Sequence, residues 1–186
     1  MIRAKDPAAA KSRLLATYAK RDLLQGESSW IDRIICYAGD VSETLFGLSP
    51  ADHLMLVGQT DVVVHCGAEV NMIKPYQVLA KANVGGTANV LDFAVRAGAP
   101  HVFTSTILPM EGEETTGYRR SKEVAEEVIL RARDSHAIPS AVLQLGDIGI
   151  SSEPGASVPD DDFLVILLKV CMPSPPRAQA STVAPP

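Results

Sequence analysis

The sequence lacks the long apolar segments and basic clusters that would point to a membrane or a nucleic acid. No run of about 18 apolar residues occurs, so no transmembrane helix is expected. The first residues, Met1–Asp6, contain no apolar core of a signal peptide. The net charge is −5 and the basic residues form no cluster, which argues against a nucleic-acid surface. These absences predict a cytoplasmic protein with no membrane or nucleic-acid partner.

Cysteine is also scarce. The chain has three cysteines, Cys36, Cys66 and Cys171, at scattered positions. Because Cys36 and Cys66 fall within segments that resemble strands, we expect buried free thiols rather than a disulfide or a metal site. The acidic segment 110–116 indicates a solvated loop, so no metal is predicted there either.

The chain does contain a regular alternation of apolar strands and helices. Its composition, 46% hydrophobic and 21% charged, is typical of a soluble globular domain. This alternation predicts an α/β fold, an open parallel sheet with helices on both faces. The expected strands are the end of one at Met1–Ala4, then Arg33–Tyr37, Asp61–Cys66, His101–Ser105 and Ser140–Leu145; the expected helices are Pro7–Leu24, Pro50–Val57, Tyr76–Ala97, one that carries Tyr118 and ends near Ser135, and Asp160–Cys171.

Several of these elements have specific signals. Asp6 and Ser49 each precede a proline, which predicts an N-cap followed by proline at the first helical position. The continuous apolar run Asp61–Cys66 is typical of a parallel strand buried on both faces, with His65 as a hydrogen-bonded core histidine. A single domain is expected over residues 1–171. The segment 172–186, rich in proline, alanine and serine, is predicted to be disordered.

One tyrosine and one lysine combine with hydroxyl residues in a pattern that indicates chemistry. Tyr118 and Lys122 are four residues apart, so a helix places both on one face. A lysine beside a tyrosine favours the phenolate and lowers the tyrosine pKa from about 10. Such a tyrosine can give a proton to a carbonyl oxygen as hydride reaches the carbon. A hydroxyl of Ser105 or Thr106, at the end of a predicted strand, can hold the same oxygen.

A series of short segments extends this pattern along most of the chain. They are IRAKD (2–6), GDVSETLFGLS (39–49), VVVHCGAEVN (62–71), PYQVLAKANVGGT (75–87), TST (104–106), GYRRSKEVAE (117–126) and DDFLVILLKVC (161–171). In this order they resemble the thioester-reductase branch of the extended short-chain dehydrogenase/reductase family. That branch comprises the terminal reductases of nonribosomal peptide synthetases, aminoadipate reductases and carboxylic acid reductases. The resemblance implies a Rossmann-like, doubly wound parallel sheet.

The resemblance also implies an activity and a set of residue roles. The family uses NADPH to reduce an acyl thioester, held on the phosphopantetheine arm of a carrier protein, to an aldehyde and sometimes to an alcohol. The matching catalytic positions are Tyr118 as proton donor, Lys122 as the lysine that holds the nicotinamide ribose, and Thr106, or less favourably Ser105, as the hydroxyl that polarises the carbonyl. The matching cofactor positions are Arg3, which reads the 2′-phosphate, Asp40 and Val41 beside the adenine, and Gly67 and Ala68, where backbone passes close to the cofactor; Asn83 matches an asparagine behind the site.

The sequence departs from the family in three respects. It contains no G-x-x-G-x-x-G turn, whose backbone amides bind the pyrophosphate, so weak NADPH binding or none at all is expected. It begins where the second strand of the family should end, which suggests a fragment without the first strand. Gln144-Leu145-Gly146 stands where the family often has Arg-Pro-Gly. We therefore expect three firm strands, with the first 55 residues or so loosely attached.

Two alternative functions stay open from the sequence. The chain could be a non-catalytic remnant or interaction module that keeps the outer half of the fold. It could also be another extended short-chain dehydrogenase/reductase, such as a sugar epimerase. The residues Ala68–Asn71 and Asp161–Leu164 favour the thioester branch by resemblance.

Overall fold

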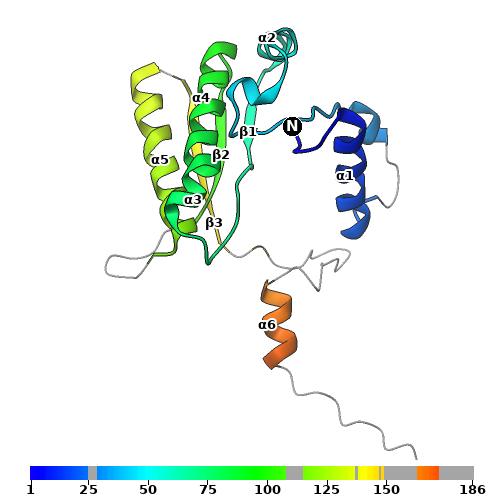
Figure 1. Ribbon diagram of the computed structural model, residues 1–186, viewed down its shortest axis with the longest axis vertical. Helices are drawn as coiled ribbons and strands as arrows, with labels where there is room; N and C mark the ends of the chain where they lie inside the picture. The colour runs from blue at the N-terminus through cyan, green and yellow to red at the C-terminus, as the bar shows by residue number, and fades with distance from the viewer. Residues whose placement is uncertain (25–28, 108–114, 137, 147, 149–162, 172–186) are drawn as a thin grey trace, which may run out of the picture.

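The computed structural model describes residues 1–24, 29–107, 115–136, 138–146, 148 and 163–171. The predicted α/β fold is confirmed, because helices alternate with strands of a parallel sheet (Figure 1). The strands are β1 (Val63–His65), β2 (His101–Thr106) and β3 (Ser140–Leu145). The helices are α1 (Pro7–Lys20), α2 (Pro50–Gln59), α3 (Tyr76–Ala80), α4 (Gly86–Ala97), α5 (Gly117–His136) and α6 (Phe163–Cys171), with two 3-10 turns, η1 (Ser29–Arg33) and η2 (Thr44–Gly47), and a π-helical turn, η3 (Lys81–Gly85).

The three strands form one parallel sheet in the order β1-β2-β3. The register pairs His65 with Phe103 and Ser105 with Gln144. Each strand has the position predicted for it, although β1 is shorter than the predicted Asp61–Cys66. The three firm strands expected from the sequence are therefore those of this sheet.

The strand predicted at Arg33–Tyr37 is wrong. The 3-10 turn η1 extends to Arg33, and the following backbone pairs with the N-terminal segment instead of with β1. Ile2 N donates to Tyr37 O at 2.9 Å, and Gly39 N donates to Ile2 O at 3.1 Å. The strand end expected at Met1–Ala4 is reduced to a single parallel bridge, Ile2 to Ala38.

The helix boundaries follow the capping signals. The Asp6 carboxylate accepts a hydrogen bond from Ala9 N at 2.7 Å, and Ser49 Oγ accepts one from Asp52 N at 3.1 Å. These contacts satisfy backbone donors that have no partner within the helix. Gly98 ends α4 with a φ of 62°, a conformation that glycine adopts at little cost.

The helix predicted over Tyr76–Ala97 is continuous but changes its hydrogen-bond pattern in the middle. α3 leads into the π-helical turn η3, which leads into α4. A π-helical turn is rare and occurs mostly at functional sites. Apolar periodicity does not reveal such a turn, because one turn of altered pitch hardly changes the spacing of apolar residues. The turn carries Asn83, which is buried.

The helices α3, α4 and α5 cover one face of the sheet (Figure 1). The core on this face includes Leu91, Phe103, Ala125 and Ile129. Burying these side chains stabilises the fold by about 1.5–3 kcal/mol for each large residue. A second cluster, centred on Phe46, joins the η2 turn and α2 to α4.

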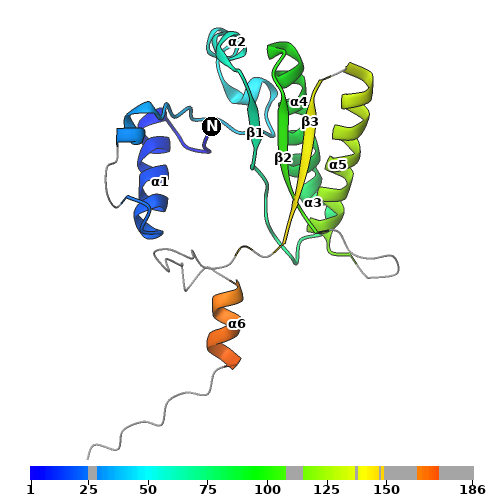
Figure 2. The same ribbon diagram turned by 180° about the vertical axis from the view of Figure 1, so that it is seen from behind.

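The other face of the sheet is open within the described residues. Figure 2 shows the three strands from that side, with none of the described helices lying over them. Val64 is 63% exposed and Leu143 is 46% exposed. Helices were expected on both faces, and those in the described ranges cover one face. The prediction that Asp61–Cys66 is buried on both faces is wrong, because no described element covers the side chains of β1 on the open face.

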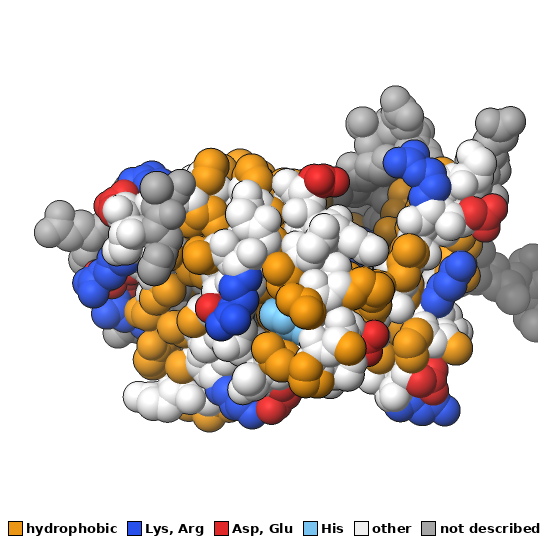
Figure 3. All heavy atoms as spheres, turned by 90° about the horizontal axis from the view of Figure 1, so that it is seen from above, with side chains coloured by type: hydrophobic (Ala, Val, Ile, Leu, Met, Phe, Trp, Pro, Cys, Tyr) orange, Lys and Arg blue, Asp and Glu red, His pale blue; other side chains and the backbone are white. Residues whose placement is uncertain are grey.

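Several other features of the sequence can be placed. None of the helices in the described part of the chain has both the length and the apolar character needed to span a membrane. The cysteines are free, as predicted, but Cys36 is only half-buried, and Cys66 and Cys171 are exposed. Seen from above, hydrophobic side chains reach the surface at many places between charged groups (Figure 3). The predicted tail, 172–186, and most of the acidic loop, 110–116, lie outside the described residues.

Two histidines occupy the core without hydrogen-bond partners. His65 is 4% exposed and His101 is 1% exposed, and their rings lie 5.9 Å apart. Within the described residues, none of their four ring nitrogens has a partner at full hydrogen-bond geometry, although the Gly67 backbone lies near enough to His65 to favour its protonation slightly. His65 is thus buried as predicted, but a well-formed hydrogen bond is not found. Burial, together with the charges of His101 and Lys122, lowers the His65 pKa to about 4, and burial also lowers the pKa of His101.

We expect this pair to make folding stability depend on pH. The unfolded chain takes up protons near the ordinary histidine pKa of about 6.5, whereas folded His65 does so only near pH 4. Stability should therefore be complete above about pH 6.5 and fall by about 3 kcal/mol as the pH approaches 4. Urea unfolding at a series of pH values measures this loss.

The variant His65→Phe provides the control for this pH dependence. Phenylalanine keeps an aromatic ring beside Phe103, which lies 5.1 Å from the His65 ring, and cannot take up a proton. Its stability should fall much less over the same range. The pKa of Asp40 is lowered to about 2, so the folding stability that this carboxylate contributes is lost at lower pH than that of His65. It therefore does not affect the comparison. If the free energy of unfolding fell equally with pH in the variant and in the unaltered chain, His65 would not be the source of the pH dependence.

Candidate active site

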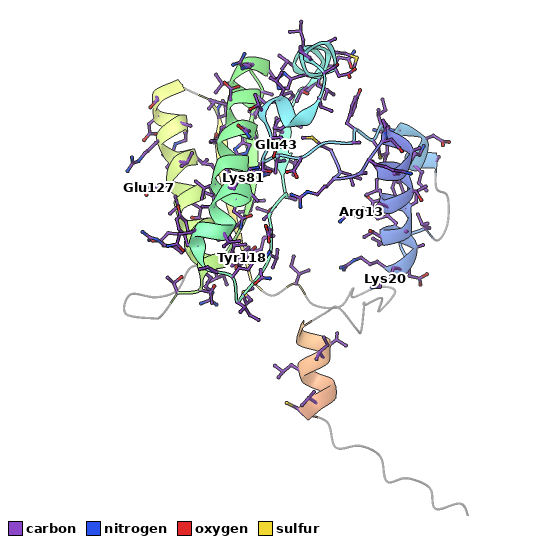
Figure 4. All side chains as sticks on the ribbon, viewed as in Figure 1. Arg13, Lys20, Glu43, Lys81, Tyr118 and Glu127 are labelled. Carbon is purple, nitrogen blue, oxygen red and sulfur yellow. The ribbon has the colours of Figure 1, made fainter. Side chains whose placement is uncertain are left out.

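The start of α5 lies against the loop that follows β1. A Cβ added at Gly117 would lie 2.6 Å from Tyr76 N and 2.7 Å from Pro75 C, and closer still to Lys74 O. Only glycine allows this approach, so Gly117 fixes where α5 begins. Thr116 caps the first turn, because its hydroxyl accepts a hydrogen bond from Arg119 N at 3.2 Å. Tyr118 is thereby placed at the lower end of α5 in Figure 4.

Lys122 is directed into the protein between α5 and β2. It is 3% exposed, and its Nζ donates to Thr104 O at 2.7 Å and lies 3.9 Å from the centre of the Phe103 ring. Burial lowers the pKa of Lys122 to about 8, opposed first by the charge of Glu126 and then by Cys66. The lysine is therefore held by β2 and by nearby charge.

Tyr118 does not have the lowered pKa predicted from its spacing with Lys122. The ring is half-buried, and burial raises the pKa of its hydroxyl. No hydrogen bond joins the two side chains, both of which are described. The prediction failed because Lys122 bonds to the backbone of β2, which leaves burial as the dominant influence on the phenol.

The two candidate hydroxyls at the end of β2 have different surroundings. Ser105 is 7% exposed, and its hydroxyl donates to Glu126 Oε1. Thr106 is half-buried and forms no hydrogen bond with another described residue through its hydroxyl. Successive side chains of a strand point to opposite faces, which explains why only Ser105 reaches α5.

Asn83 joins three parts of the site. Its Oδ1 accepts from Glu69 N at 2.7 Å, and its Nδ2 donates to Glu69 O at 3.0 Å. The same Nδ2 donates to the Ser121 hydroxyl at 2.8 Å. The π-helical turn thus presents one amide that fixes the segment after β1 to the face of α5 that carries Lys122.

Five of the six predicted cofactor residues, all except Lys122, line one cavity of about 560 Å³ between the N-terminal segment and the loop after β1. Arg3, Asp40, Val41, Gly67 and Ala68 all contribute to it. A cavity of this size falls in the range of small-molecule sites. The structure therefore brings together residues that lie far apart in the sequence.

A second arginine reaches this cavity and was not predicted. Arg13, on α1, lines the cavity and donates from its guanidinium to Arg3 O at 2.7 Å. Figure 4 shows its side chain projecting from α1 toward the sheet. The sequence could not predict that these two arginines meet. Arg3 precedes the helix, so the ten-residue interval to Arg13 does not place them on one helical face. Two guanidiniums at one cavity fit a phosphorylated ligand.

Asp40 is held in a fixed position at the edge of the cavity. Its carboxylate accepts from Ser42 N at 2.9 Å and forms an ion pair with Arg3 at 2.7 Å. The Ser42 backbone bond, opposed by partial burial and assisted by Arg3, lowers the Asp40 pKa to about 2. The next residue, Val41, is fixed by a hydrogen bond from Asn89 Nδ2 to its carbonyl at 2.8 Å.

The candidate catalytic and cofactor residues occupy neighbouring regions rather than one pocket. Neither Tyr118 nor Lys122 lines the cavity that contains Arg3 and Asp40. The segment Gly67–Glu69 connects the two regions, because it lines the cavity and bonds through Asn83 to α5. Within the described part of the chain, no group of three histidine, cysteine or acidic residues could hold a metal ion.

Comparison with known proteins identifies relatives of this arrangement. The model of the NAD-binding family described as "Male sterility protein" matches residues 1–116 and 108–176. Glycine betaine reductase ATRR of Emericella nidulans is 33% identical over an alignment of 155 residues, and the match covers 73% of this chain and 12% of that protein. The carboxylic acid reductase of Segniliparus rugosus is 33% identical over an alignment of 138 residues, and the match covers 72% of this chain and 12% of that protein.

A solved structure shares the same fold. The terminal R domain from the myxalamid PKS-NRPS biosynthetic pathway superposes with a TM-score of 0.81 and 29% identity. The match covers 91% of this chain and 46% of that structure. The chain thus spans about half of that domain and about an eighth of the two curated relatives.

Proposed function

The chain belongs to the NAD-binding family described as male sterility protein, and on this premise we propose that residues 1–171 carry an NADPH-dependent reductase domain. Its substrate is an acyl thioester on the phosphopantetheine arm of a carrier protein, and its product is an aldehyde. The family membership supports a nicotinamide cofactor, which would supply hydride to the carbonyl carbon. The names of the relatives, a carboxylic acid reductase and a terminal reductase domain, support an activated carboxylate as substrate.

The observation that carries this proposal is the arrangement at the end of β2 and the start of α5. Tyr118 presents a phenol whose pKa is raised, so it holds its proton at neutral pH and can donate it. Among the described residues the Thr106 hydroxyl has no hydrogen-bond partner, whereas that of Ser105 is bonded to Glu126. We therefore assign polarisation of the carbonyl to Thr106 and a supporting role to Ser105.

Lys122 has two functions in this proposal. First, it would hold the nicotinamide ribose. Second, as a buried cation on the same face of α5 as Tyr118, it would favour negative charge on the Tyr118 oxygen as the proton leaves. Its bond to Thr104 O keeps it at the end of β2, two residues before Thr106. Proton donor, cation and hydroxyl are thus assigned to neighbouring positions on two elements.

The choice of NADPH rather than NADH rests on the arginines of the 560 Å³ cavity. Arg3 and Arg13 would hold the 2′-phosphate, and Asp40 and Val41 would lie beside the adenine. Gly67 and Ala68 would let the backbone approach the cofactor. The Arg3 side chain is 65% exposed, so it keeps donors for a phosphate while its Nε is paired with Asp40.

Replacing Arg13 by alanine tests the cofactor proposal. We expect NADPH affinity to fall by about tenfold or more, because a charge-assisted hydrogen bond to phosphate is worth about 1.5–3 kcal/mol. NADH affinity should stay the same, since NADH has no 2′-phosphate. Calorimetric titration of both cofactors measures the difference. Binding of NADPH to the unaltered chain is itself expected to be weak, because no glycine-rich turn holds the pyrophosphate.

The matched control for this experiment is Lys20→Ala. Lys20 is a cation on the same helix, but it does not line the cavity. Its replacement should leave the preference for NADPH intact. If the unaltered chain bound neither cofactor, the reductase proposal would fail for this chain and the reading as a non-catalytic module would replace it.

A further inference from the structure

Glu126 is a buried acidic residue that the proposed chemistry does not use. It lies on α5, four residues after Lys122 and eight after Tyr118, so the three side chains share one face of the helix. Glu126 is only 9% exposed. A carboxylate this deep is costly unless hydrogen bonds or charges compensate it, so its partners show what it does in the fold.

The two oxygens of this carboxylate bind the two neighbouring strands. Ser105, on β2, donates its hydroxyl to Oε1, and Gln144, on β3, donates Nε2 to Oε2 at 2.9 Å. Ser105 and Gln144 are directly paired in the sheet register. Glu126 therefore ties the ends of two strands to α5 at the position where Thr106 follows Ser105.

Both hydrogen-bond partners of Glu126 are neutral. None of the ion pairs in the described part of the chain includes Glu126. Its negative charge is therefore not cancelled by a direct cationic partner. Lys122 is the buried cation one turn away, and its own hydrogen bond goes to a neutral carbonyl, Thr104 O.

We propose that Glu126 is a positioning residue of the site: it fixes the ends of β2 and β3 against α5 and supplies the negative charge that keeps buried Lys122 protonated. The inference rests on the proposed role of Lys122 in holding the cofactor ribose. Neutral hydrogen-bond partners suit this role, because they hold the carboxylate in place without neutralising it.

The other groups around Lys122 do not replace this charge. Burial favours the neutral amine, and the charge of Glu126 is the largest opposing influence on the Lys122 pKa, followed by Cys66. His65, on β1, adds only positive charge when it is protonated. The Phe103 ring and Thr104 O, on β2, contribute contacts without a full charge.

Titration of Lys122 by carbon-13 NMR tests the inference. The side-chain signal is assigned with Lys122→Arg, and the midpoint is then compared between the unaltered chain and Glu126→Gln, without cofactor. The midpoint, about pH 8 in the unaltered chain, should fall in Glu126→Gln. The control is Glu127→Gln: this neighbour is exposed, pairs with Arg131 and points away from the sheet in Figure 4, so it should leave the midpoint in place.

A second variant keeps the test decisive if Glu126→Gln does not fold. Gln144 is exposed, so Gln144→Arg has room for a cation that pairs with Glu126 and cancels its charge. This variant should also lower the Lys122 midpoint while the tie to β3 remains. An unchanged midpoint in the folded variants would overturn the inference. Because the titration needs no cofactor, this failure is distinct from a failure to bind NADPH.

Discussion

Replacing Tyr118 by phenylalanine is expected to reduce the rate of thioester reduction by about 10²–10⁴-fold, the usual contribution of a positioned general acid. The binding of NADPH should stay nearly unchanged, because the hydroxyl acts on the substrate oxygen in the transition state and not on the cofactor. Oxidation of NADPH in the presence of an acyl-pantetheine thioester measures the rate. Fluorescence titration of the cofactor measures the binding.

Three features of the structure support this expectation. The phenol is half-buried, its pKa is raised, and it stands at the fixed start of α5. The phenylalanine ring fills the same space, so packing is preserved. The control is Tyr18→Phe, which makes the same change in a tyrosine far from α5 in the chain. The centres of the Tyr18 and Trp30 rings lie 5.3 Å apart. Turnover that persists in Tyr118→Phe would remove Tyr118 from the proposed mechanism.

Local signals in the sequence were sufficient to predict the central strands and the helix starts. Ser140–Leu145 has its predicted bounds, and the caps at Asp6 and Ser49 form the predicted hydrogen bonds. Such features depend on residues that are close in the chain. The strand at Arg33–Tyr37 failed for the opposite reason, since pairing is decided by partners far away, here Ile2.

The burial of β1 could not be predicted from its composition. A continuous apolar run indicates cover on both faces, but whether cover exists depends on other elements of the fold. Val64 is 63% exposed, whereas the adjacent His65 is buried against His101 and Phe103.

The resemblance predicted which residues form the site, and the structure shows what surrounds each of them. The cavity brings together the cofactor residues that the resemblance implied, from Arg3 to Ala68. Sequence spacing could not predict the hydrogen bond from Lys122 to Thr104 O or the position of Arg13 at the cavity. It could not predict the hydrogen bond from Ser105 to Glu126 either. Each of these contacts crosses between elements, which is why one sequence does not reveal them.

The largest structural effect is expected from Gly117→Ala. The added methyl group would meet three backbone atoms of the segment Lys74–Tyr76, including Tyr76 N at 2.6 Å. Backbone atoms cannot rotate away as side chains do, so the start of α5 must shift. We expect a loss of about 1–3 kcal/mol of stability, typical of overpacking. A displacement of Tyr118 by about 1 Å would in addition lower the rate by about 10²-fold.

The control for this glycine is Gly58→Ala. Gly58 lies within α2, and an added Cβ there would meet no atom within 4 Å. Alanine is the better helix former, so this change should stabilise the protein by about 0.5–1 kcal/mol. Urea unfolding and the reduction rate, measured for both variants, compare the effects of an added methyl group at Gly117 and at Gly58. If Gly117→Ala kept the stability and rate of the unaltered chain, close packing at Lys74–Tyr76 would not be what fixes Tyr118, and the site would owe its geometry to Asn83 and Ser121 instead.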